Sequence, residues 1–198
     1  APSDECPPSR LAPASAKVTL AGGQSGDALI LTKPIGSGVI LAGEMQGKSR
    51  GADVLACWEA MTVLQGAAAR LLAPLAHAMT DVTGFGLMGH LWNICGASGT
   101  GAELSLDAVP LLPGALALAE RGVRSSLYPQ NRAALNAVVA GDDGPKADLL
   151  FDPQTAGGLL AAVPEAEADR VLTRLAEAGA PAVRIGQLTD LAGRIDIA

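Results

Sequence analysis

The stretch Met79–Leu91, MTDVTGFGLMGHL, decides the fold that this sequence predicts. A short apolar segment, Ala76–Met79, leads into an aspartate, a threonine and two glycines. Apolar residues then return at helical spacing, at Leu87, Met88, Leu91 and Ile94. This order predicts a strand, a tight turn and a helix, with Asp81 at the point where the backbone turns.

Two roles are open for the polar residues of this turn. Backbone N–H groups at a helix N-terminus bind phosphate, and a carboxylate beside them can hold the Mg²⁺ that accompanies a nucleotide. Asp81 or Thr83 could instead cap the helix, which is the commoner use of these residue types at such a position. The residues alone leave both interpretations open.

Elsewhere, apolar runs bounded by turn residues predict strands, and apolar residues three or four apart predict helices. The predicted strands are Lys17–Leu20, Ala28–Thr32, Ala102–Leu106, Ala147–Phe151, Leu159–Val163, Val183–Gln187 and Arg194–Ile197. The predicted helices are Asp53–Leu72, Leu116–Glu120, Arg132–Ala140 and Glu165–Ala178. One apolar stripe of the first helix consists of Val54, Trp58, Met61, Leu64, Ala68 and Leu71. Because these elements interleave without a regular strand–helix–strand repeat, the sequence predicts an α+β fold, a mixed sheet covered by helices.

Composition excludes several classes of protein. A chain of 198 residues can bury one sizeable core, as a single domain or as two small lobes. Its hydrophobic fraction is 49% and its mean hydropathy is +0.31, but no stretch approaches the roughly 18 apolar residues of a membrane span. The aromatic fraction of 3% and the net charge of −6 argue against binding to nucleic acid. We therefore expect neither a nucleic-acid nor a membrane partner.

The three cysteines, Cys6, Cys57 and Cys95, lie far apart and show no CxxC spacing. They predict neither a disulfide framework nor a zinc site, and we expect reduced thiols in a cytoplasmic protein. Residues 1–16 are rich in proline and lack the basic and apolar segments of a signal peptide. This segment is predicted to be a disordered leader or linker before a domain that spans residues 17–198.

Four motifs together resemble the C-terminal lobe of the selenophosphate synthetases (selenide, water dikinases), which belong to the aminoimidazole-ribonucleotide-synthetase-like, or PurM-like, superfamily. They follow the order of that family: residues 26–38 (GDALILTKPIGSG), 80–91 (TDVTGFGLMGHL), 152–160 (DPQTAGGLL) and 185–187 (IGQ). The resemblance extends from about Lys17 to the C-terminus. It implies a layered α/β/α sandwich with a mixed sheet, similar to the PurM C-terminal domain.

The resemblance also implies an activity, in which ATP, selenide and water give selenophosphate, AMP and phosphate. In that family, ATP is the substrate and lies between an N-terminal lobe and this one, with Mg²⁺ ions bridging its phosphates to several aspartates. Asp81 matches the metal-binding aspartate that the C-terminal lobe contributes. Thr83, Gly84 and Gly86 would let the backbone approach the nucleotide.

No catalytic residue is expected in this chain. The family carries its reactive cysteine or selenocysteine, its catalytic lysine and the other metal-binding aspartates in an N-terminal lobe that is absent from this sequence. The resemblance therefore implies that the isolated chain is inactive and that the full-length protein, which binds ATP and selenide, is a homodimer. The wording of residues 125–131, together with Ala156 in place of the usual serine, also resembles forms with a flavin-type oxidoreductase fused upstream.

Several other polar residues are given structural interpretations. Lys33 could reach a phosphate from its proline-glycine turn but is interpreted as a solvated lysine. Asp152 is interpreted as a turn residue and His90 as a packed or capping histidine. Asn131 is expected to line the cleft, and His77 has no partner visible in the sequence. Two other functions stay open: another ATP-dependent PurM-like enzyme (aminoimidazole ribonucleotide synthetase, thiamine-monophosphate kinase or hydrogenase-maturation dehydratase), or a non-catalytic docking module.

Overall fold

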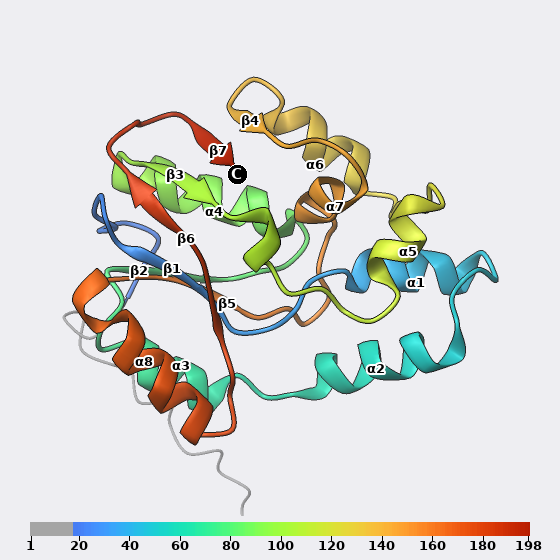
Figure 1. The fold of residues 1–198 in the computed structure, drawn as a ribbon, viewed down its shortest axis with the longest axis horizontal. Helices are drawn as coiled ribbons and strands as arrows, with labels where there is room; N and C mark the ends of the chain where they lie inside the picture. Colours follow the sequence, from blue (N-terminus) through green and yellow to red (C-terminus); the bar gives the residue numbers. More distant parts are fainter. Residues whose placement is uncertain (1–17) are drawn as a thin grey trace, which may run out of the picture.

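Seven strands form one mixed sheet in the computed structural model, which describes residues 18–198 (Figure 1). The strand order is β2–β5–β1–β6–β3–β7–β4. The strands are β1 (Ala28–Leu31), β2 (Ala78–Asp81), β3 (Gly101–Leu104), β4 (Val139–Gly141), β5 (Leu159–Val163), β6 (Val183–Thr189) and β7 (Ile195–Ile197). Neighbouring strands from β2 to β3 run antiparallel, whereas β7 runs parallel to both β3 and β4. The predicted leader, residues 1–16, lies outside the described residues.

Helices connect these strands. They are α1 (Ser37–Met45), α2 (Gly51–Thr62), α3 (Gly66–Leu72), α4 (Gly86–Ser98), α5 (Ala115–Glu120), α6 (Tyr128–Leu135), α7 (Pro145–Asp148) and α8 (Glu165–Glu177), with short 3₁₀ turns η2 (Leu106–Ala108) and η3 (Leu149–Phe151). The helix α8 closely matches its prediction, since Pro164 precedes it and two glutamates occupy its first turn.

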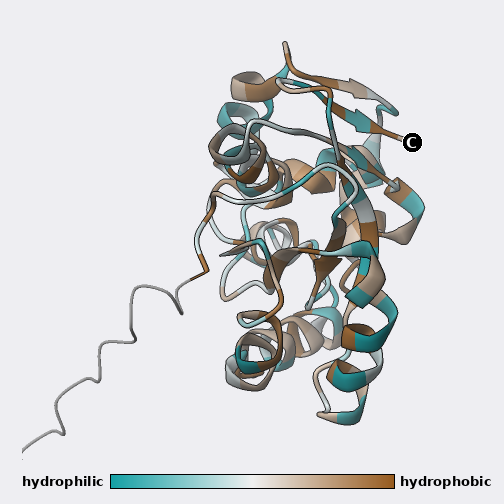
Figure 2. Cartoon of the chain, turned by 90° about the vertical axis from the view of Figure 1, so that its left-hand side faces the viewer, coloured by the Kyte–Doolittle hydropathy of each residue, from teal (hydrophilic) through white to brown (hydrophobic). Residues whose placement is uncertain are grey.

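Side chains of β1 alternate between two apolar layers, as the period of a strand requires. Ile30 packs with residues of α3 and α8 on one face of the sheet, whereas Leu29 and Leu31 belong to a larger cluster that includes α4 on the other face. Figure 2 shows hydrophobic residues along the strands between helices that carry hydrophilic residues. The expected layered α/β/α sandwich with a mixed sheet is confirmed.

Two helices, α2 and α3, replace the single helix predicted over Asp53–Leu72. The chain leaves the first helix at Val63, whose backbone is extended, and enters the second at Gly66. The two helices pack against different partners, α2 against α1 and α3 against α8, which one straight helix could not do. The predicted apolar stripe is wrong at two positions, since Trp58 is 54% exposed and Leu64 is 88% exposed. Its other members, Val54, Met61, Ala68 and Leu71, pack against the two apolar clusters.

The segment Ala147–Phe151, predicted as a strand, is instead helical in α7 and η3. Gly144 and Pro145 supply a start signal for α7. Four of the five predicted strand residues are buried, and a short buried apolar run cannot be assigned to strand or helix from its periodicity. The packing of this run on α4 and α5 selects the helical form.

The helix predicted over Arg132–Ala140 is shifted toward the N-terminus. It begins at Tyr128, has Pro129 in its first turn and ends at Leu135. The residues Val139–Gly141 form the edge strand β4, paired in parallel with β7. Pairing with a strand more than fifty residues away, which local periodicity does not reveal, ends the helix early.

Two other predicted strands also differ from the structure. The segment 18–20 forms no strand, although the carbonyl of Thr19 accepts a hydrogen bond from the N–H of Met79 (2.9 Å); Lys17 lies outside the described residues. The strand predicted over Ala76–Met79 is β2, which begins two residues later and ends at Asp81. The helix α1 was not predicted.

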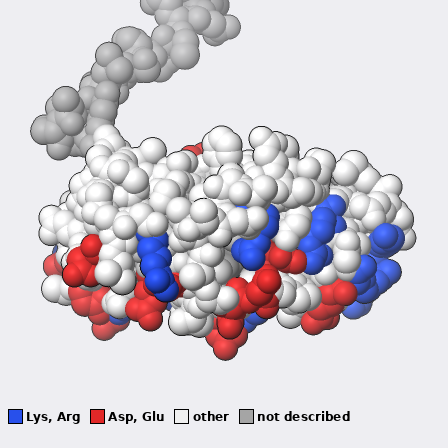
Figure 3. All heavy atoms as spheres, turned by 90° about the horizontal axis from the view of Figure 1, so that it is seen from above, with Lys and Arg blue, Asp and Glu red and all other residues white. Residues whose placement is uncertain are grey.

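Within residues 18–198, no helix combines the length and the apolar character needed to cross a membrane. On the face seen in Figure 3, basic side chains lie interspersed with acidic ones. This face therefore presents no extended surface of a single charge.

Candidate functional site

Three of the four sequence motifs meet at one end of the sheet. Because β5 runs antiparallel to both β1 and β2, the C-terminal ends of β1 and β2 lie beside the start of β5. Asp81 pairs with Leu159, and the N–H of Thr32 donates to the carbonyl of Leu159 (3.1 Å). The segments that follow β1 and β2 and the segment that precedes β5 are thus brought together.

Gln154 joins these three segments. Its Oε1 accepts hydrogen bonds from the backbone N–H groups of Gly36 (2.9 Å) and Ser37 (3.1 Å) at the start of α1. Its own backbone N–H donates to the carbonyl of Thr83 in the turn after β2 (2.9 Å). Gln154 is 5% exposed, so these bonds form inside the protein and fix the turn relative to α1.

Asp152 also binds the first turn of α1. Its Oδ2 accepts hydrogen bonds from the N–H of Val39 (3.0 Å) and from Nε2 of Gln154 in its own loop (3.3 Å), so the carboxylate binds both a helix N-terminus and the turn that it begins. The side chain is only 2% exposed, and burial raises the pKa of the Asp152 carboxyl to about 6, against the opposing effect of its hydrogen bonds.

This raised pKa predicts a pH dependence of stability. Between about pH 4 and pH 6 the folded state binds more protons at Asp152 than the unfolded state does. The free energy of unfolding should therefore fall as the pH rises through this window, by roughly 3 kcal/mol at most, since one pKa unit corresponds to about 1.4 kcal/mol. Urea denaturation of the wild type and of Asp152→Asn at several pH values measures the effect. The wild type should lose stability relative to the variant between pH 4 and pH 7, and a constant difference would contradict the assignment.

Asp81 is exposed at the end of β2. Within the described part of the chain, its carboxylate makes no hydrogen bond or ion pair. No side chain caps α4, so the alternative that Asp81 or Thr83 caps this helix is wrong. An exposed carboxylate without a competing partner is suited to serve as one oxygen ligand of Mg²⁺. Among residues 18–198, no three His, Cys, Asp or Glu side chains gather closely enough to hold a metal by themselves.

Only some of the backbone N–H groups in the turn after β2 have a hydrogen-bond acceptor among residues 18–198. The N–H of Thr83 donates to Nε2 of His90 (2.9 Å), and the N–H of Gly86 donates to the carbonyl of Thr83 (3.0 Å). No described group accepts a hydrogen bond from the N–H of Gly84 or of Phe85. Of the residues proposed to approach a nucleotide, Thr83 and Gly86 thus have internal bonds, and Phe85 is a donor that the sequence did not indicate.

His90 holds this turn from the helix that follows it. Its Nε2 accepts from the N–H of Thr83, and the Thr83 hydroxyl lies 3.1 Å from the same nitrogen. Burial lowers the pKa of His90, while the nearby Asp81 carboxylate acts in the opposite direction. A neutral imidazole with an accepting Nε2 fits this arrangement, and the histidine is packed, as its position in the helix predicted.

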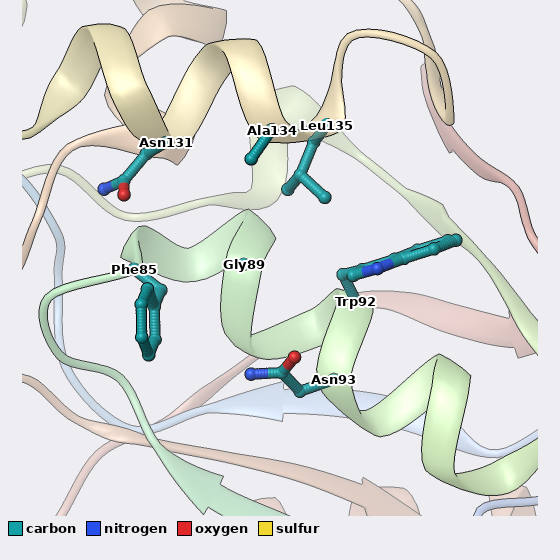
Figure 4. A pocket seen from close by; sticks show the side chains of 7 residues that line it. All are labelled: Phe85, Gly89, Trp92, Asn93, Asn131, Ala134 and Leu135. Carbon is teal, nitrogen blue, oxygen red and sulfur yellow. The ribbon is translucent and has the colours of Figure 1, made fainter.

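A pocket of about 160 Å³ lies between α4 and α6, next to the turn (Figure 4). Its lining consists of Phe85, Gly89, Trp92, Asn93, Asn131, Ala134 and Leu135. Nδ2 of Asn131 donates to the carbonyls of Gly84 (2.9 Å) and Phe151 (3.0 Å). Asn131 therefore lines this pocket and also holds the carbonyl of Gly84, while its place in the nucleotide cleft stays a prediction.

Residues 24–196 match the family described as "AIR synthase related protein, C-terminal domain". The chain belongs to this family. Selenide, water dikinase of Treponema denticola is 35% identical to it over 175 residues, which cover 84% of this chain and 49% of that protein. The sequence resemblance to selenide, water dikinases is thus confirmed.

Solved structures share the fold of this AIR-synthase-related domain. Thiamine-monophosphate kinase from Stenotrophomonas maltophilia K279a has a TM-score of 0.66 at 19% identity, over 91% of this chain and 52% of that one. Hydrogenase maturation protein HypE in complex with ATP has a TM-score of 0.55 at 20% identity, over 91% of this chain and 49% of that one. These similarities confirm the PurM-like fold. The domain spans about half the length of the curated relative it matches.

Two residues of the domain have partners that the sequence did not reveal. Lys33 is only 7% exposed and its Nζ donates to the carbonyl of Ala156 (2.9 Å), so its interpretation as a solvated lysine is wrong. Burial lowers the pKa of Lys33. Nδ1 of His77 lies 2.9 Å from a carboxylate oxygen of Asp27, a buried residue. Both pairs join segments far apart in the sequence.

The cysteines of the domain that the structure describes are buried. Burial raises the pKa of Cys57, and it raises the pKa of Cys95 to about 11. Both therefore favour the unreactive thiol form. Cys6 lies outside the described residues.

Proposed function

We propose that this chain is the C-terminal, ATP- and Mg²⁺-binding lobe of a selenophosphate synthetase, in which ATP, selenide and water give selenophosphate, AMP and phosphate. The observation that carries the proposal is the placement of Asp81: an exposed carboxylate at the end of β2, in the turn that also contains Gly84 and Phe85. Among residues 18–198 neither this carboxylate nor the N–H groups of Gly84 and Phe85 have a hydrogen-bond partner. The similarity to selenide, water dikinases supports the choice of reaction.

The chemistry of phosphoryl transfer fits such a surface. Catalysis depends chiefly on positioning the phosphates and neutralising their charge. Bound Mg²⁺ would supply that neutralisation. In this lobe, Asp81 would hold the metal, and the N–H groups of Gly84 and Phe85 would donate to phosphate oxygens, while Thr83 and Gly86 shape the turn that presents them.

The remaining parts of the active site are proposed to lie in an N-terminal lobe. One aspartate cannot saturate the oxygen coordination of Mg²⁺, and no metal-binding cluster forms within residues 18–198. The relative is about twice as long as the aligned region, which leaves room for such a lobe. We propose that the full-length protein is a cytoplasmic homodimer that binds ATP and selenide.

An acceptor screen of the full-length protein tests the reaction. With Mg-ATP and selenide it should form AMP and selenophosphate, which ³¹P NMR detects directly. Aminoimidazole ribonucleotide synthetase, thiamine-monophosphate kinase or hydrogenase-maturation dehydratase activity instead of the selenide reaction would assign the lobe to another PurM-like enzyme. No turnover with any acceptor would favour a docking module.

The isolated 198-residue chain should show no turnover and only weak affinity for Mg-ATP. In the proposed enzyme the N-terminal lobe supplies the other half of the nucleotide cleft, and one carboxylate and two N–H groups provide few contacts. Isothermal titration calorimetry of the chain and of the full-length protein measures the difference. Micromolar binding of Mg-ATP to the isolated chain would contradict this prediction.

A further inference from the structure

We propose that Asn131 is a positioning residue for nucleotide binding: it orients the Gly84–Phe85 peptide so that the N–H of Phe85 faces the phosphates. The inference rests on the proposed function and adds to it a residue from α6, a helix distant in sequence from the turn. Figure 4 shows Asn131 projecting from α6 toward the segment that carries Phe85.

Both hydrogens of the Asn131 amide are used for this purpose. Nδ2 donates to the carbonyl of Gly84 at 2.9 Å and to the carbonyl of Phe151 at 3.0 Å. The second bond anchors the amide to η3, which packs on α4. The position of the Gly84 carbonyl is therefore set by α6 and η3 together and not by the turn alone.

The planar peptide between Gly84 and Phe85 also fixes the direction of the N–H of Phe85. A trans peptide is planar, with its C=O and N–H pointing in opposite directions. A Gly84 carbonyl directed at Asn131 thus directs the N–H of Phe85 away from Asn131. In the preceding peptide, the Thr83 carbonyl accepts from Gln154 and Gly86, which directs the N–H of Gly84 away from those partners.

Gly84 itself leaves space for a ligand. A Cβ built on this residue would meet no described atom within 4 Å, and its φ is not positive. Neither backbone strain nor close packing within residues 18–198 accounts for a glycine here. The absence of a side chain therefore leaves the backbone of the turn accessible at the point where the two N–H groups lie, as close approach to a phosphate requires.

Binding measurements on the full-length protein test the inference. The probe is the non-hydrolysable analogue Mg-AMPPCP, studied by calorimetry with wild type, Asn131→Ala and Asn131→Asp. Loss of the amide donors should weaken binding about tenfold in Asn131→Ala and more in Asn131→Asp, whose carboxylate repels both carbonyls. The matched control is Asn93→Asp, which adds the same charge in the same pocket without touching the turn and should stay within about twofold of wild type.

Kinetics separate positioning from mere stability. If Asn131 positions the nucleotide, its variants should raise KM for ATP about tenfold and leave KM for selenide within about twofold. A purely structural residue would lower only the fraction of active protein and leave both KM values unchanged. Binding of Mg-AMPPCP by folded Asn131→Ala within twofold of wild type would overturn the inference, even if the selenide reaction is confirmed.

Hydrogen exchange of the wild type covers the case in which the variants do not fold. Adding Mg-AMPPCP should slow exchange at Gly84 and Phe85 about tenfold and change Thr83 and Gly86 little, because their N–H groups already have internal acceptors. Unchanged exchange at Gly84 and Phe85 in the nucleotide-bound protein would overturn the inference. If the wild type binds Mg-AMPPCP but does not use selenide, the proposed reaction fails while this inference stands.

Discussion

Asp81→Asn in the full-length protein should abolish selenide-dependent AMP formation. Asparagine keeps the size of the side chain but removes the charge that would hold Mg²⁺, so we expect a loss of at least about a thousandfold in kcat/KM for ATP. The Asp81 side chain makes no hydrogen bond or ion pair among residues 18–198, so the free energy of unfolding should change by less than about 0.5 kcal/mol. Separation of AMP by anion-exchange chromatography measures the reaction.

Asp190→Asn is the matched control. Asp190 is exposed just after β6, whose C-terminal end lies at the opposite end of the sheet from Asp81, because β6 is antiparallel to β1. The control removes the same charge from the protein and should leave turnover close to that of wild type. Near-normal turnover of Asp81→Asn would refute the metal-binding role and, with it, the main support for the proposed function.

Gly86→Ala should destabilise the protein by about 3 kcal/mol or more. Gly86 has φ of +72°, a conformation that costs an L-residue of order 1 kcal/mol or more. A Cβ at this position would lie 2.8 Å from the carbonyl carbon of Phe151 and 2.9 Å from its oxygen. Backbone atoms cannot rotate away as a flexible side chain can, so overpacking adds to the strain. Urea denaturation followed by circular dichroism measures the loss.

Gly96→Ala in the same helix gives the opposite expectation. Gly96 is exposed in α4, and a Cβ there would meet nothing within 4 Å. Alanine should stabilise the protein by up to about 1 kcal/mol through its higher helix propensity. If the two substitutions changed stability in the same direction, the steric account of Gly86 would be wrong.

Local patterns gave the elements whose own residues specify them. The acids and the apolar face of α8, and the short apolar runs of β1 and β5, depend only on residues that are close together in the chain. Where tertiary packing determines the secondary structure, the sequence predicted it poorly. The buried run Ala147–Phe151 fits either a strand or a helix. The start of α1 depends on Gln154, more than a hundred residues away, which accepts hydrogen bonds from the N–H groups of Gly36 and Ser37.

The features of the site likewise divide into those that local sequence predicts and those that depend on contacts between distant residues. Asp81 and its glycine turn could be predicted because the carboxylate, the turn and the start of α4 are contiguous in the chain. The contacts of Lys33 and Asn131 could not, because their partners, Ala156 and Gly84, are distant in sequence and meet only when the sheet forms. A lysine beside a proline has no local signal of burial.

The sequence by itself thus determined a strand, a turn and a helix around one carboxylate, since backbone preferences and apolar periodicity act over a few residues. Only the tertiary structure decided which N–H groups of that turn have no acceptor among residues 18–198. The antiparallel pairing of β5 with β1 and β2 places Gln154 against Thr83, and the packing of α6 places Asn131 against Gly84. Hydrogen bonds are short-ranged, so their partners are fixed by where the fold places them and not by their order along the chain.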